Sequence, residues 1–377
     1  MNFPETAVPG TATDQATDAT TDPAKDRSGV PGGTTMPAEW APHERTWMAF
    51  PPSNDTFGLP GSDTLARART AWVRVAHTIA RHEPVTVIAD PVDLDTARTM
   101  LGPGIAVHPV PLDDAWLRDS GPTFIHSGDG SVQAVDWIFN GWGGQSWAAW
   151  GQDEQVGRKV TDLADVPTIS SPLVNEGGGF HVDGRGSVLL TETVQLDPGR
   201  NPSATKASVE AEVHARLGTH HAIWLPRGLS RDYEEFGTRG HVDIVASFTA
   251  AGTVLLHRQD NPDHPDHTVT RLLRSTLEAA VDAEGRALTI VDVPAPTVIR
   301  EEDEFVDWSY INHYVANGVV VLCAFDDPND AVAQRILQEA YPDRTVELVD
   351  ARDIFAFGGG IHCITQQQPA PHMVTVP

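Results

Sequence analysis

A thiol stands close behind a run of glycines near the C-terminal end of the sequence. Cys363 follows Gly358–Gly360 at a distance of three residues. Glycine lets the backbone approach a ligand closely or adopt a positive φ, and a thiol on so tight a loop is placed like a nucleophile. The alternative, a small buried apolar side chain, fits the other cysteine better, because Cys323 lies beside the apolar segment Val319–Leu322. We predict that Cys363 is a nucleophile and that Cys323 belongs to the core.

Two histidines are each followed by an aspartate two residues later, His241 by Asp243 and His181 by Asp183. Residues i and i+2 of a strand share a face, so we expect the members of each pair to project together. A histidine beside a carboxylate keeps its proton affinity near neutral pH and is held in one tautomer, which suits acid–base catalysis. A single His-x-Asp pattern is a weak signal, and one of the two pairs could be structural.

The segments around these pairs resemble one another. Gly179–Gly184 and Gly240–Ile244 share the order glycine, histidine, valine, aspartate, and Gly360–Ile364 is a weaker third copy. Internal similarity of this kind indicates repeated units that each send one strand end to a common centre.

Charged residues and a tryptophan crowd the segment Leu112–Pro122. They are Asp113, Asp114, Trp116, Arg118 and Asp119. Carboxylates bind a guanidinium or ammonium group through paired hydrogen bonds, and a tryptophan can cover the face of a cation. A solvated charged loop is the alternative. Further along, Glu176 precedes Gly177–Gly179, so its carboxylate could lie close to a bound ligand.

Together these residues describe one chemistry, in which a thiol attacks an electron-poor carbon, carboxylates hold a planar cation and a histidine moves protons. The sequence has no phosphate-binding loop, dinucleotide fingerprint or zinc-type CxxC spacing, so we expect no nucleotide cofactor and no metal. Two alternatives stay open. One is a metal-dependent amidohydrolase with His181, Asp183, His241 and Asp243 as ligands, and the other is a binder of cations without turnover.

Composition narrows the partners and the compartment. The 377 residues carry a net charge of −26, from 26 Lys and Arg against 52 Asp and Glu. So acidic a surface repels phosphate backbones and suits a small cationic ligand, so nucleic acid is not expected as a partner. No apolar run of the length that spans a membrane is present. Two cysteines in so long a chain are no disulfide scaffold, which favours the reducing cytoplasm.

Alternating helices and strands must position the reactive residues. Apolar spacing predicts helices over 65–82, 204–217, 269–281 and 330–340, and β-branched runs predict strands over 85–89, 188–191, 223–225, 254–257 and 319–325. Strands outnumber helices, which favours a mixed α/β fold. Residues 1–35 lack apolar periodicity and the pattern of a signal peptide, so we expect a disordered tail there and a single domain over residues 36–377.

Six motifs stand in one order along the chain. They are Met36-Pro37-Ala38-Glu39-Trp40, Trp116-x-Arg118-Asp119-x-Gly121-Pro122, Asn140-Gly141-Trp142-Gly143-Gly144, Glu176-Gly177-Gly178, Gly240-His241-Val242-Asp243, and Gly358-Gly359-Gly360-Ile361-His362-Cys363-Ile364-Thr365-Gln366-Gln367. In order and content they resemble the motifs of the agmatine deiminase family, which includes bacterial peptidylarginine deiminases within the guanidine-modifying superfamily. The resemblance covers about residues 36–369. It implies a five-bladed α/β propeller (pentein) with pseudo-fivefold ββαβ repeats, and hydrolytic deimination of a guanidino compound without a cofactor.

The resemblance also implies roles for single residues. Cys363 matches the nucleophile that forms an amidino-cysteine intermediate, and His241 matches the general acid and base. Asp119 and Asp243 match the carboxylates that hold the guanidinium nitrogens. Two further residues are implied in the substrate channel and pocket, Trp116 and Glu176.

One position departs from the pattern of members that act on agmatine. These usually carry an acidic residue four positions before the catalytic histidine, which helps to bind the far ammonium of the substrate, but this chain has Gly237 there and Arg239 close by. Either Glu234 or Glu235 supplies the carboxylate and pairs with Arg239, or Arg239 binds a guanidino substrate that ends in a carboxylate. Agmatine, converted to N-carbamoylputrescine in putrescine biosynthesis, is the preferred expectation. Another guanidino compound and peptidylarginine are the alternatives, and a homo-oligomer is compatible with all of them.

Overall fold

The structure is a computed structural model that describes residues 33–234, 236–301 and 303–372. The expected N-terminal tail, residues 1–35, lies outside the described residues except at its end. There Thr35 pairs with His126: its N–H donates to the His126 carbonyl at 2.9 Å and its carbonyl accepts from His126 at 2.8 Å. The described fold therefore begins slightly before Met36.

Within the described residues, the strands form five sheets of three or four strands and one two-stranded hairpin. The sheets have the strand orders β18-β1-β2-β3, β4-β5-β6, β7-β8-β9, β10-β11-β12 and β15-β16-β17, and the hairpin is β13-β14. The strands are β1 His43–Ala49, β2 Val85–Ala89, β3 Ala106–Pro109, β4 Thr123–His126, β5 Val132–Ile138, β6 Thr168–Val174, β7 Phe180–Val182, β8 Ser187–Thr191, β9 His221–Leu225, β10 Ala246–Ala250, β11 Thr253–Arg258, β12 Thr289–Pro294, β13 Arg300–Glu301, β14 Glu304–Phe305, β15 Tyr314–Ala316, β16 Val319–Ala324, β17 Thr345–Asp350 and β18 Thr365–Pro369.

The five sheets repeat one order of elements, in which an antiparallel strand pair is followed by a helix and a third strand parallel to the second. The helices are α1 Asp63–Ala80, α2 Leu94–Leu101, α3 Leu117–Ser120, α4 Gly141–Gly144, α5 Val156–Ala164, α6 Glu192–Gln195, α7 Lys206–Leu217, α8 Asp266–Glu278, α9 Asp330–Ala340 and α10 Arg352–Phe355. The crossovers from the second to the third strand of each unit run through α1, α5, α7, α8 and α9, because parallel strands need a long connection. In the first sheet, α2 leads on to a fourth strand, β3, which is parallel to β2. In the first unit the C-terminal strand β18 supplies the antiparallel partner of β1. The chain therefore has an α/β fold of five similar units.

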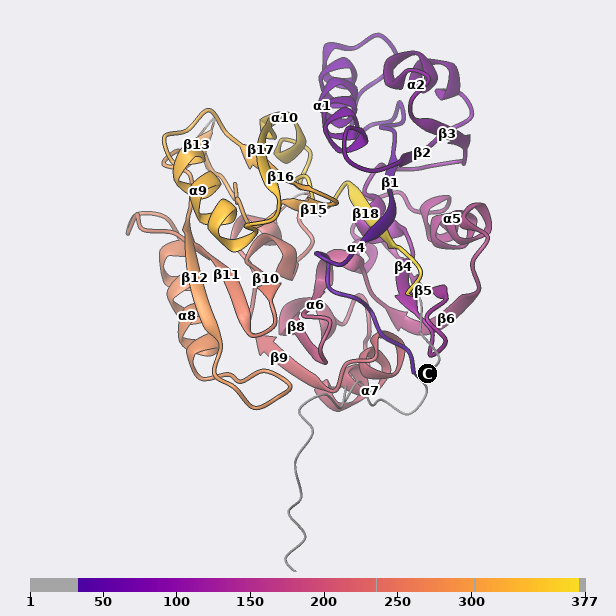
Figure 1. The fold of residues 1–377 in the computed structure, drawn as a ribbon. Coiled ribbons are helices and arrows are strands. Elements are labelled where there is room, and N and C mark those ends of the chain that lie inside the picture. The colour runs from indigo at the N-terminus through magenta and orange to yellow at the C-terminus, as the bar shows by residue number, and fades with distance from the viewer. Residues whose placement is uncertain (1–32, 235, 302, 373–377) are drawn as a thin grey trace, which may run out of the picture.

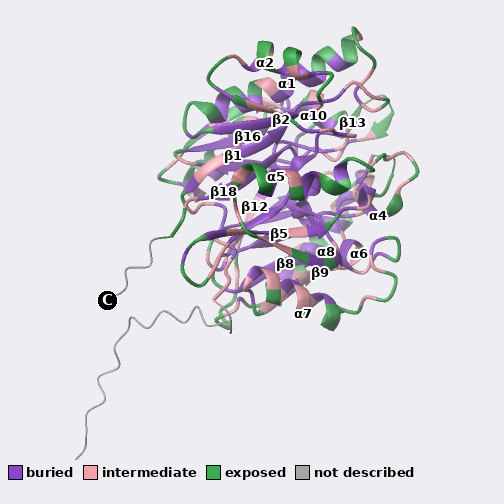
Figure 2. Ribbon diagram, turned by 90° about the vertical axis from the view of Figure 1, so that its right-hand side faces the viewer, coloured by how far each residue is buried: buried purple, intermediate pink, exposed green. Residues whose placement is uncertain are grey.

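The crossover helices lie around the outside of the molecule and the strands lie further in (Figure 1). The strands are largely buried, and exposed residues gather on the outward faces of the helices (Figure 2). None of the helices in the described ranges has the length and apolar character needed to cross a membrane.

Local sequence explains where the helices and inner strands form. Ser62 accepts a hydrogen bond from the N–H of Leu65 and so caps α1, whose apolar face packs into the core. The predicted helix over 330–340 coincides with α9, and the other three predicted helices and all five predicted strands match α1, α7, α8, β2, β8, β9, β11 and β16 within a few residues. The expectation that Cys323 is a core residue is also confirmed, because its side chain is fully buried in β16.

Candidate active site

Five short segments, each just before the first strand of one unit, meet at one place. They supply Asp119 before β4, Glu176 and Gly178 before β7, His241 and Asp243 before β10, Asn312 before β15, and Cys363 before β18. All of these residues are buried. Because the segments occupy equivalent places in their units, the fold brings together residues that are far apart in the sequence.

The Cys363 thiol lies between a carboxylate and an amide. Its Sγ donates to Oδ2 of Asp243 over 3.6 Å, and Nδ2 of Asn312 donates to Sγ at 3.2 Å. Only 7 % of Cys363 is exposed. Burial, together with the negative charges of Asp243 and Asp119, raises the pKa of Cys363 well above its usual value. The thiol is therefore protonated at neutral pH until a cation offsets the two carboxylates.

Asp119 is held by two donors from different segments. Nε1 of Trp142 donates to its Oδ2 at 2.9 Å, and the N–H of Gly178 donates to its Oδ1 at 3.1 Å. Burial raises the pKa of Asp119 to about 6, although the charge of His241 opposes the shift. Asp119 is thus an oriented carboxylate that becomes fully charged only near neutral pH.

Asp243 is the more strongly ionised of the two carboxylates. Nδ1 of His362 lies 2.7 Å from its Oδ2, and Nδ2 of Asn312 donates to its backbone carbonyl at 3.3 Å. Burial disfavours the charged form of Asp243, but the hydrogen bond and charge of His362 outweigh it and keep the pKa below its usual value. Asp243 is therefore an anion at neutral pH, in contact with Cys363.

His241 connects this centre to a permanent anion. Its Nε2 lies 3.2 Å from Oε2 of Glu176, and its Nδ1 faces Oδ1 of Asp119 at 3.8 Å without a hydrogen-bond partner among the described residues. Burial alone would lower the pKa of His241, but the charge of Asp119 and the hydrogen bond to Glu176 raise it to about 9. His241 is therefore protonated at neutral pH and can donate a proton from Nδ1.

Gly178 borders the space that these groups surround. A Cβ at this position would overlap Nδ1 of His241 and would lie 3.0 Å from Oδ1 of Asp119 and from Oδ2 of Asp243. Two carboxylates and an imidazole nitrogen thus converge on one small space, and Oδ2 of Asp243 joins that space to the Cys363 thiol. A planar guanidinium group, which carries N–H donors in several directions, fits the two carboxylate acceptors, and Nδ1 of His241 faces the same space as a proton donor.

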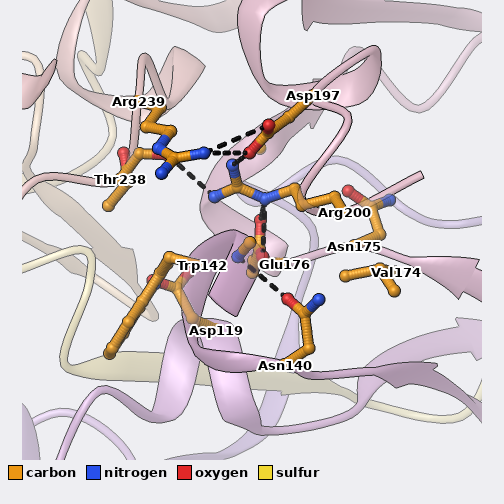
Figure 3. A network of polar contacts seen from close by, with 12 residues as sticks. Asp119, Asn140, Trp142, Val174, Asn175, Glu176, Asp197, Arg200, Thr238 and Arg239 are labelled. Atoms are coloured by element: carbon orange, nitrogen blue, oxygen red, sulfur yellow. Dashed lines mark hydrogen bonds and ion pairs between the residues drawn. The ribbon is translucent and has the colours of Figure 1, made fainter. Parts of the chain in front are cut away.

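Glu176 contacts His241 on one side and a buried ion network on the other (Figure 3). Nε of Arg200 donates to both carboxylate oxygens of Glu176, at 2.9 and 3.0 Å, and Nη1 of Arg200 donates to Oδ2 of Asp197 at 3.0 Å. Burial works against the charged form of Glu176, but the charge of Arg200 and the hydrogen bond to His241 bring the pKa down to about 2. Glu176 therefore orients His241, which is a narrower role than the general pocket residue expected from the sequence.

Arg239 ends this network at the surface, with 37 % of its side chain exposed. Its Nη1 donates to both oxygens of Asp197, at 3.2 and 3.1 Å (Figure 3). Of the two glutamates expected to pair with Arg239, Glu234 is not its partner and Glu235 lies outside the described residues. The charge of Arg239 is thus matched by Asp197, which no sequence motif singles out.

The expectation that His241 and Asp243 share the face of a strand is wrong. His241 has extended backbone, and Val242–Ile244 then form a 3-10 turn that precedes β10. Asp232 imposes this path, because its Oδ2 accepts the backbone N–H groups of Gly240 and His241 at 2.6 and 3.1 Å. The two side chains nevertheless face the same space, because the turn replaces the alternation of a strand.

The other pair, His181 and Asp183, does not join this site. Oδ1 of Asp183 accepts the N–H groups of Arg185 and Ser187 in the turn between β7 and β8, and Nε2 of His181 lies 3.5 Å from Glu39. The four side chains of the metal-dependent alternative are therefore not gathered. More broadly, no group of three or more His, Cys, Asp and Glu within the described ranges is arranged to hold a metal ion.

Trp116 and Cys363 both lie close to Gly359. A Cβ at Gly359 would lie 2.8 Å from Cζ3 of Trp116 and 3.1 Å from Sγ of Cys363, and the Trp116 ring packs edge-on against Trp72 with centroids 5.4 Å apart. The rest of the charged segment has other partners. Nη1 of Arg118 donates to Oε1 of Gln367, Asp113 accepts the N–H of Gln152, and Asp114 accepts the N–H of Ala115.

Sequence reasoning missed three residues that hold this centre: Trp142, Arg200 and Asn312. Trp142 lies within a glycine-rich motif, which gave a signal for a special backbone but none for its contact with Asp119. Arg200 and Asn312 follow no pattern that could have found them. Arg200 contacts Glu176 across 24 residues of its own unit, and Asn312 contacts residues of two other units.

Comparisons with known proteins agree with this geometry. Residues 35–369 match the family model described as Porphyromonas-type peptidyl-arginine deiminase. A protein of Streptomyces coelicolor is 58 % identical over 335 residues, covering 89 % of this chain and 98 % of the relative. The agmatine deiminase of Stutzerimonas stutzeri is 39 % identical over 362 residues, covering 90 % and 96 %. Among solved structures, the agmatine deiminase of Enterococcus faecalis has a TM-score of 0.84 at 31 % identity, covering 91 % of this chain and 97 % of that chain.

Proposed function

We infer that this chain, which belongs to the Porphyromonas-type peptidyl-arginine deiminase family, hydrolyses a C–N bond of agmatine and releases ammonia and N-carbamoylputrescine. The observation that carries the proposal is that Asp119, Asp243 and His241 enclose the space beside Gly178 while Cys363 contacts Asp243. The relatives named agmatine deiminase support agmatine as the substrate. The product is a precursor of putrescine.

Substrate binding prepares the nucleophile. Asp119 and Asp243 accept hydrogen bonds from the guanidinium nitrogens, and charge-assisted bonds of this kind are strong when buried. The positive charge of the guanidinium offsets the two carboxylates that raise the pKa of Cys363, so binding favours loss of the thiol proton. The Cys363 thiolate, with Asn312 donating to it, then faces the central carbon of the substrate.

The first half of the reaction forms an S–C bond and breaks a C–N bond. The thiolate adds to the guanidinium carbon and gives a neutral tetrahedral intermediate. Protonated His241 donates its proton to one amino group, which leaves as ammonia, and the substrate stays attached to Cys363 as an alkylated thiouronium cation. Glu176 stabilises the imidazolium of His241 before the transfer and holds the ring afterwards.

The second half uses the same groups in reverse. Neutral His241 takes a proton from a water molecule, and the resulting hydroxide adds to the thiouronium carbon. The C–S bond then breaks and the Cys363 thiolate leaves. The protonated urea group gives up a proton and becomes the carbamoyl product, and this proton restores the Cys363 thiol in place of the one released to solvent on substrate binding. The protein returns to its starting state, and one water has replaced one ammonia.

The surroundings of Arg239 favour a cationic substrate over a guanidino carboxylate. Asp197 already pairs with Arg239, so no unmatched positive charge opposes the ammonium of agmatine. The experiment that tests the function compares ammonia release from agmatine, 4-guanidinobutyrate and an arginine-containing peptide, in wild type and in Arg239→Ala. We expect the highest kcat/KM for agmatine and a change of less than about threefold in its ratio to the acid on mutation. A preference for the acid that disappears in Arg239→Ala would contradict agmatine as the substrate.

We also propose that the five units are the blades of a five-bladed α/β propeller. Their common order of elements, the peripheral helices (Figure 1) and the equivalent origin of the site residues support this arrangement. The free thiols of Cys323 and Cys363 support the cytoplasm as the place of action.

A further inference from the structure

His362, the neighbour of the nucleophile, is a buried residue that the reaction described above does not use. Its Nδ1 lies 2.7 Å from Oδ2 of Asp243, and its Nε2 lies 2.8 Å from Oε1 of Glu39. The backbone N–H of His362 donates to Oδ1 of Asn312 at 3.0 Å, which fixes the position of the ring. The imidazole of His362 thus links Asp243 of the candidate site to Glu39 of the motif Met36–Trp40.

The geometry requires both ring nitrogens of His362 to be donors. Each faces a carboxylate oxygen, and an imidazole can donate from both nitrogens only as an imidazolium. Glu39 has further cations and donors around it, Nη1 of Arg118 at 3.6 Å and Nε2 of His181 at 3.5 Å, which keep it ionised. Along the line from Glu39 through His362 to Asp243, the side chains are therefore an anion, a cation and an anion.

Two other histidines lie beside this line and make different contacts. Nδ1 of His181 accepts the backbone N–H of Phe248 at 3.2 Å, and its Nε2 lies 3.5 Å from Oε2 of Glu39. Nδ1 of His313 lies 3.1 Å from the carbonyl of Tyr310, and burial lowers the pKa of His313 to about 4. Arg118, whose Nε donates to the carbonyl of His362 at 3.3 Å, is the one other cation that faces the ring among the described residues.

We propose that His362, as an imidazolium anchored by Glu39, is a positioning residue that keeps Asp243 ionised and holds its Oδ2 toward the substrate and Cys363. The proposal rests on the proposed deiminase function. Oδ2 is the oxygen that faces the space beside Gly178 and that contacts the thiol. A proton on that oxygen would stand where a guanidinium N–H has to donate, so the site fails whenever Asp243 is neutral.

The test compares the acid limb of the pH profile of kcat/KM in wild type, His362→Gln, Glu39→Gln and the control His313→Gln. A glutamine at 362 can still donate to Asp243 but carries no charge, so the pKa of Asp243 rises and activity is lost preferentially at low pH. We expect the ratio of kcat/KM at pH 8.5 to that at pH 6 to be higher in His362→Gln than in wild type, because the acid limb of the variant lies at higher pH. Glu39→Gln should shift the ratio in the same direction by less. His313→Gln should leave the ratio unchanged within about twofold, because His313 is buried nearby but contacts neither carboxylate.

A binding measurement separates this inference from the reaction itself. In a Cys363→Ala background, the Kd of agmatine is measured by calorimetry at pH 6 and pH 8.5, with and without His362→Gln. We expect His362→Gln to weaken binding at pH 6 much more than at pH 8.5. If the wild type released no ammonia from any guanidino compound, the proposed function would fail, whereas this binding result would still report on His362 and Asp243.

Parallel pH profiles for His362→Gln and wild type, at any level of activity, would overturn the proposal, because a purely structural role lowers activity equally at all pH values. An unshifted profile in Glu39→Gln would overturn the part assigned to Glu39. If His362→Gln does not fold, Glu39→Gln carries the test, because it removes the anchor of the imidazolium and leaves the ring and the loop before β18 in place.

Discussion

The Sγ atom of Cys363 lies 3.6 Å from Oδ2 of Asp243, so the proposed nucleophile and a carboxylate proposed to bind the substrate share one buried contact. The negative charge of Asp243 has two opposite effects at this contact. The anion disfavours the thiolate, but the same anion attracts the cationic substrate. A bound guanidinium group removes this opposition, because its positive charge pairs with Asp243 and so lowers the pKa of Cys363. In the proposed mechanism, activation of the nucleophile is therefore coupled to binding of the substrate.

The first prediction concerns the reactivity of the free thiol. Wild-type Cys363 should react slowly with iodoacetamide at pH 7, because burial and the carboxylates Asp243 and Asp119 raise its pKa. Asp243→Asn removes one of these charges, so the pH profile of alkylation should move to lower pH while turnover is lost. The control Asp183→Asn alters a carboxylate in the turn between β7 and β8 and should leave the profile in place. If the pH profile of alkylation is the same in Asp243→Asn and in wild type, the Asp243 carboxylate does not raise the pKa of Cys363.

The second prediction concerns the basic limb of the pH profile. His241 must be protonated to release ammonia, and its pKa is raised to about 9, so kcat/KM should stay high through neutral pH and fall above about pH 9. Glu176→Gln removes an anion that stabilises the imidazolium, so the limb should move to lower pH. The surface variant Glu192→Gln is the control. His241→Asn should lose about 10²–10⁴-fold in kcat/KM at all pH values. An unmoved limb in Glu176→Gln would assign the basic limb to another group.

The third prediction concerns the space beside Gly178. The backbone of Gly178 lies outside the left-handed region, so alanine fits the local conformation, but its Cβ would overlap Nδ1 of His241 and crowd both carboxylates. Gly178→Ala should therefore lower kcat/KM for agmatine by at least about a hundredfold, while circular dichroism shows that the protein stays folded. Gly151→Ala is a matched control, because a Cβ there meets no atom within 4 Å. Near-normal activity in Gly178→Ala would place the guanidinium elsewhere.

The fourth prediction separates the buried and the exposed ends of the ion network. Arg200→Met leaves Glu176 and Asp197 buried without their shared cation, so we expect a loss of about 3–5 kcal/mol in the free energy of unfolding. Arg239→Ala removes a partly exposed partner of Asp197 and should cost less than about 1 kcal/mol. Urea unfolding of both variants measures the difference. Equal losses would mean that the buried pair does not hold the network together.

The sequence predicts the inner parts of each unit better than the parts that carry the chemistry. Strands such as β8, β11 and β16 are apolar and β-branched, because they are buried on both faces, and the pattern of their residues reveals them. The first strands are short or polar, as in Thr365–Pro369, and give no such pattern. These are the strands that the site residues precede.

The candidate site was predictable to the extent that its residues belong to recognisable motifs. Cys363, His241, Asp119 and Asp243 are of types that do chemistry, and the glycines beside them mark close approach. Most of their supporting partners lie in other units, and Trp142 lies 23 residues from Asp119 within one unit, so no local spacing reports them. Asp197 illustrates the limit, because its pairing with Arg239 depends on how two distant loops meet and not on the glutamates beside Arg239 in the sequence.

The most direct test of the proposed mechanism is mass spectrometry of the Cys363 peptide after an acid quench during turnover of agmatine. The mechanism predicts a transient adduct on Cys363 with the mass of agmatine less one ammonia, which forms in wild type and is absent from Cys363→Ala together with all ammonia release. Ammonia release that persists in Cys363→Ala, or turnover in wild type with the adduct on no cysteine, would contradict the covalent mechanism.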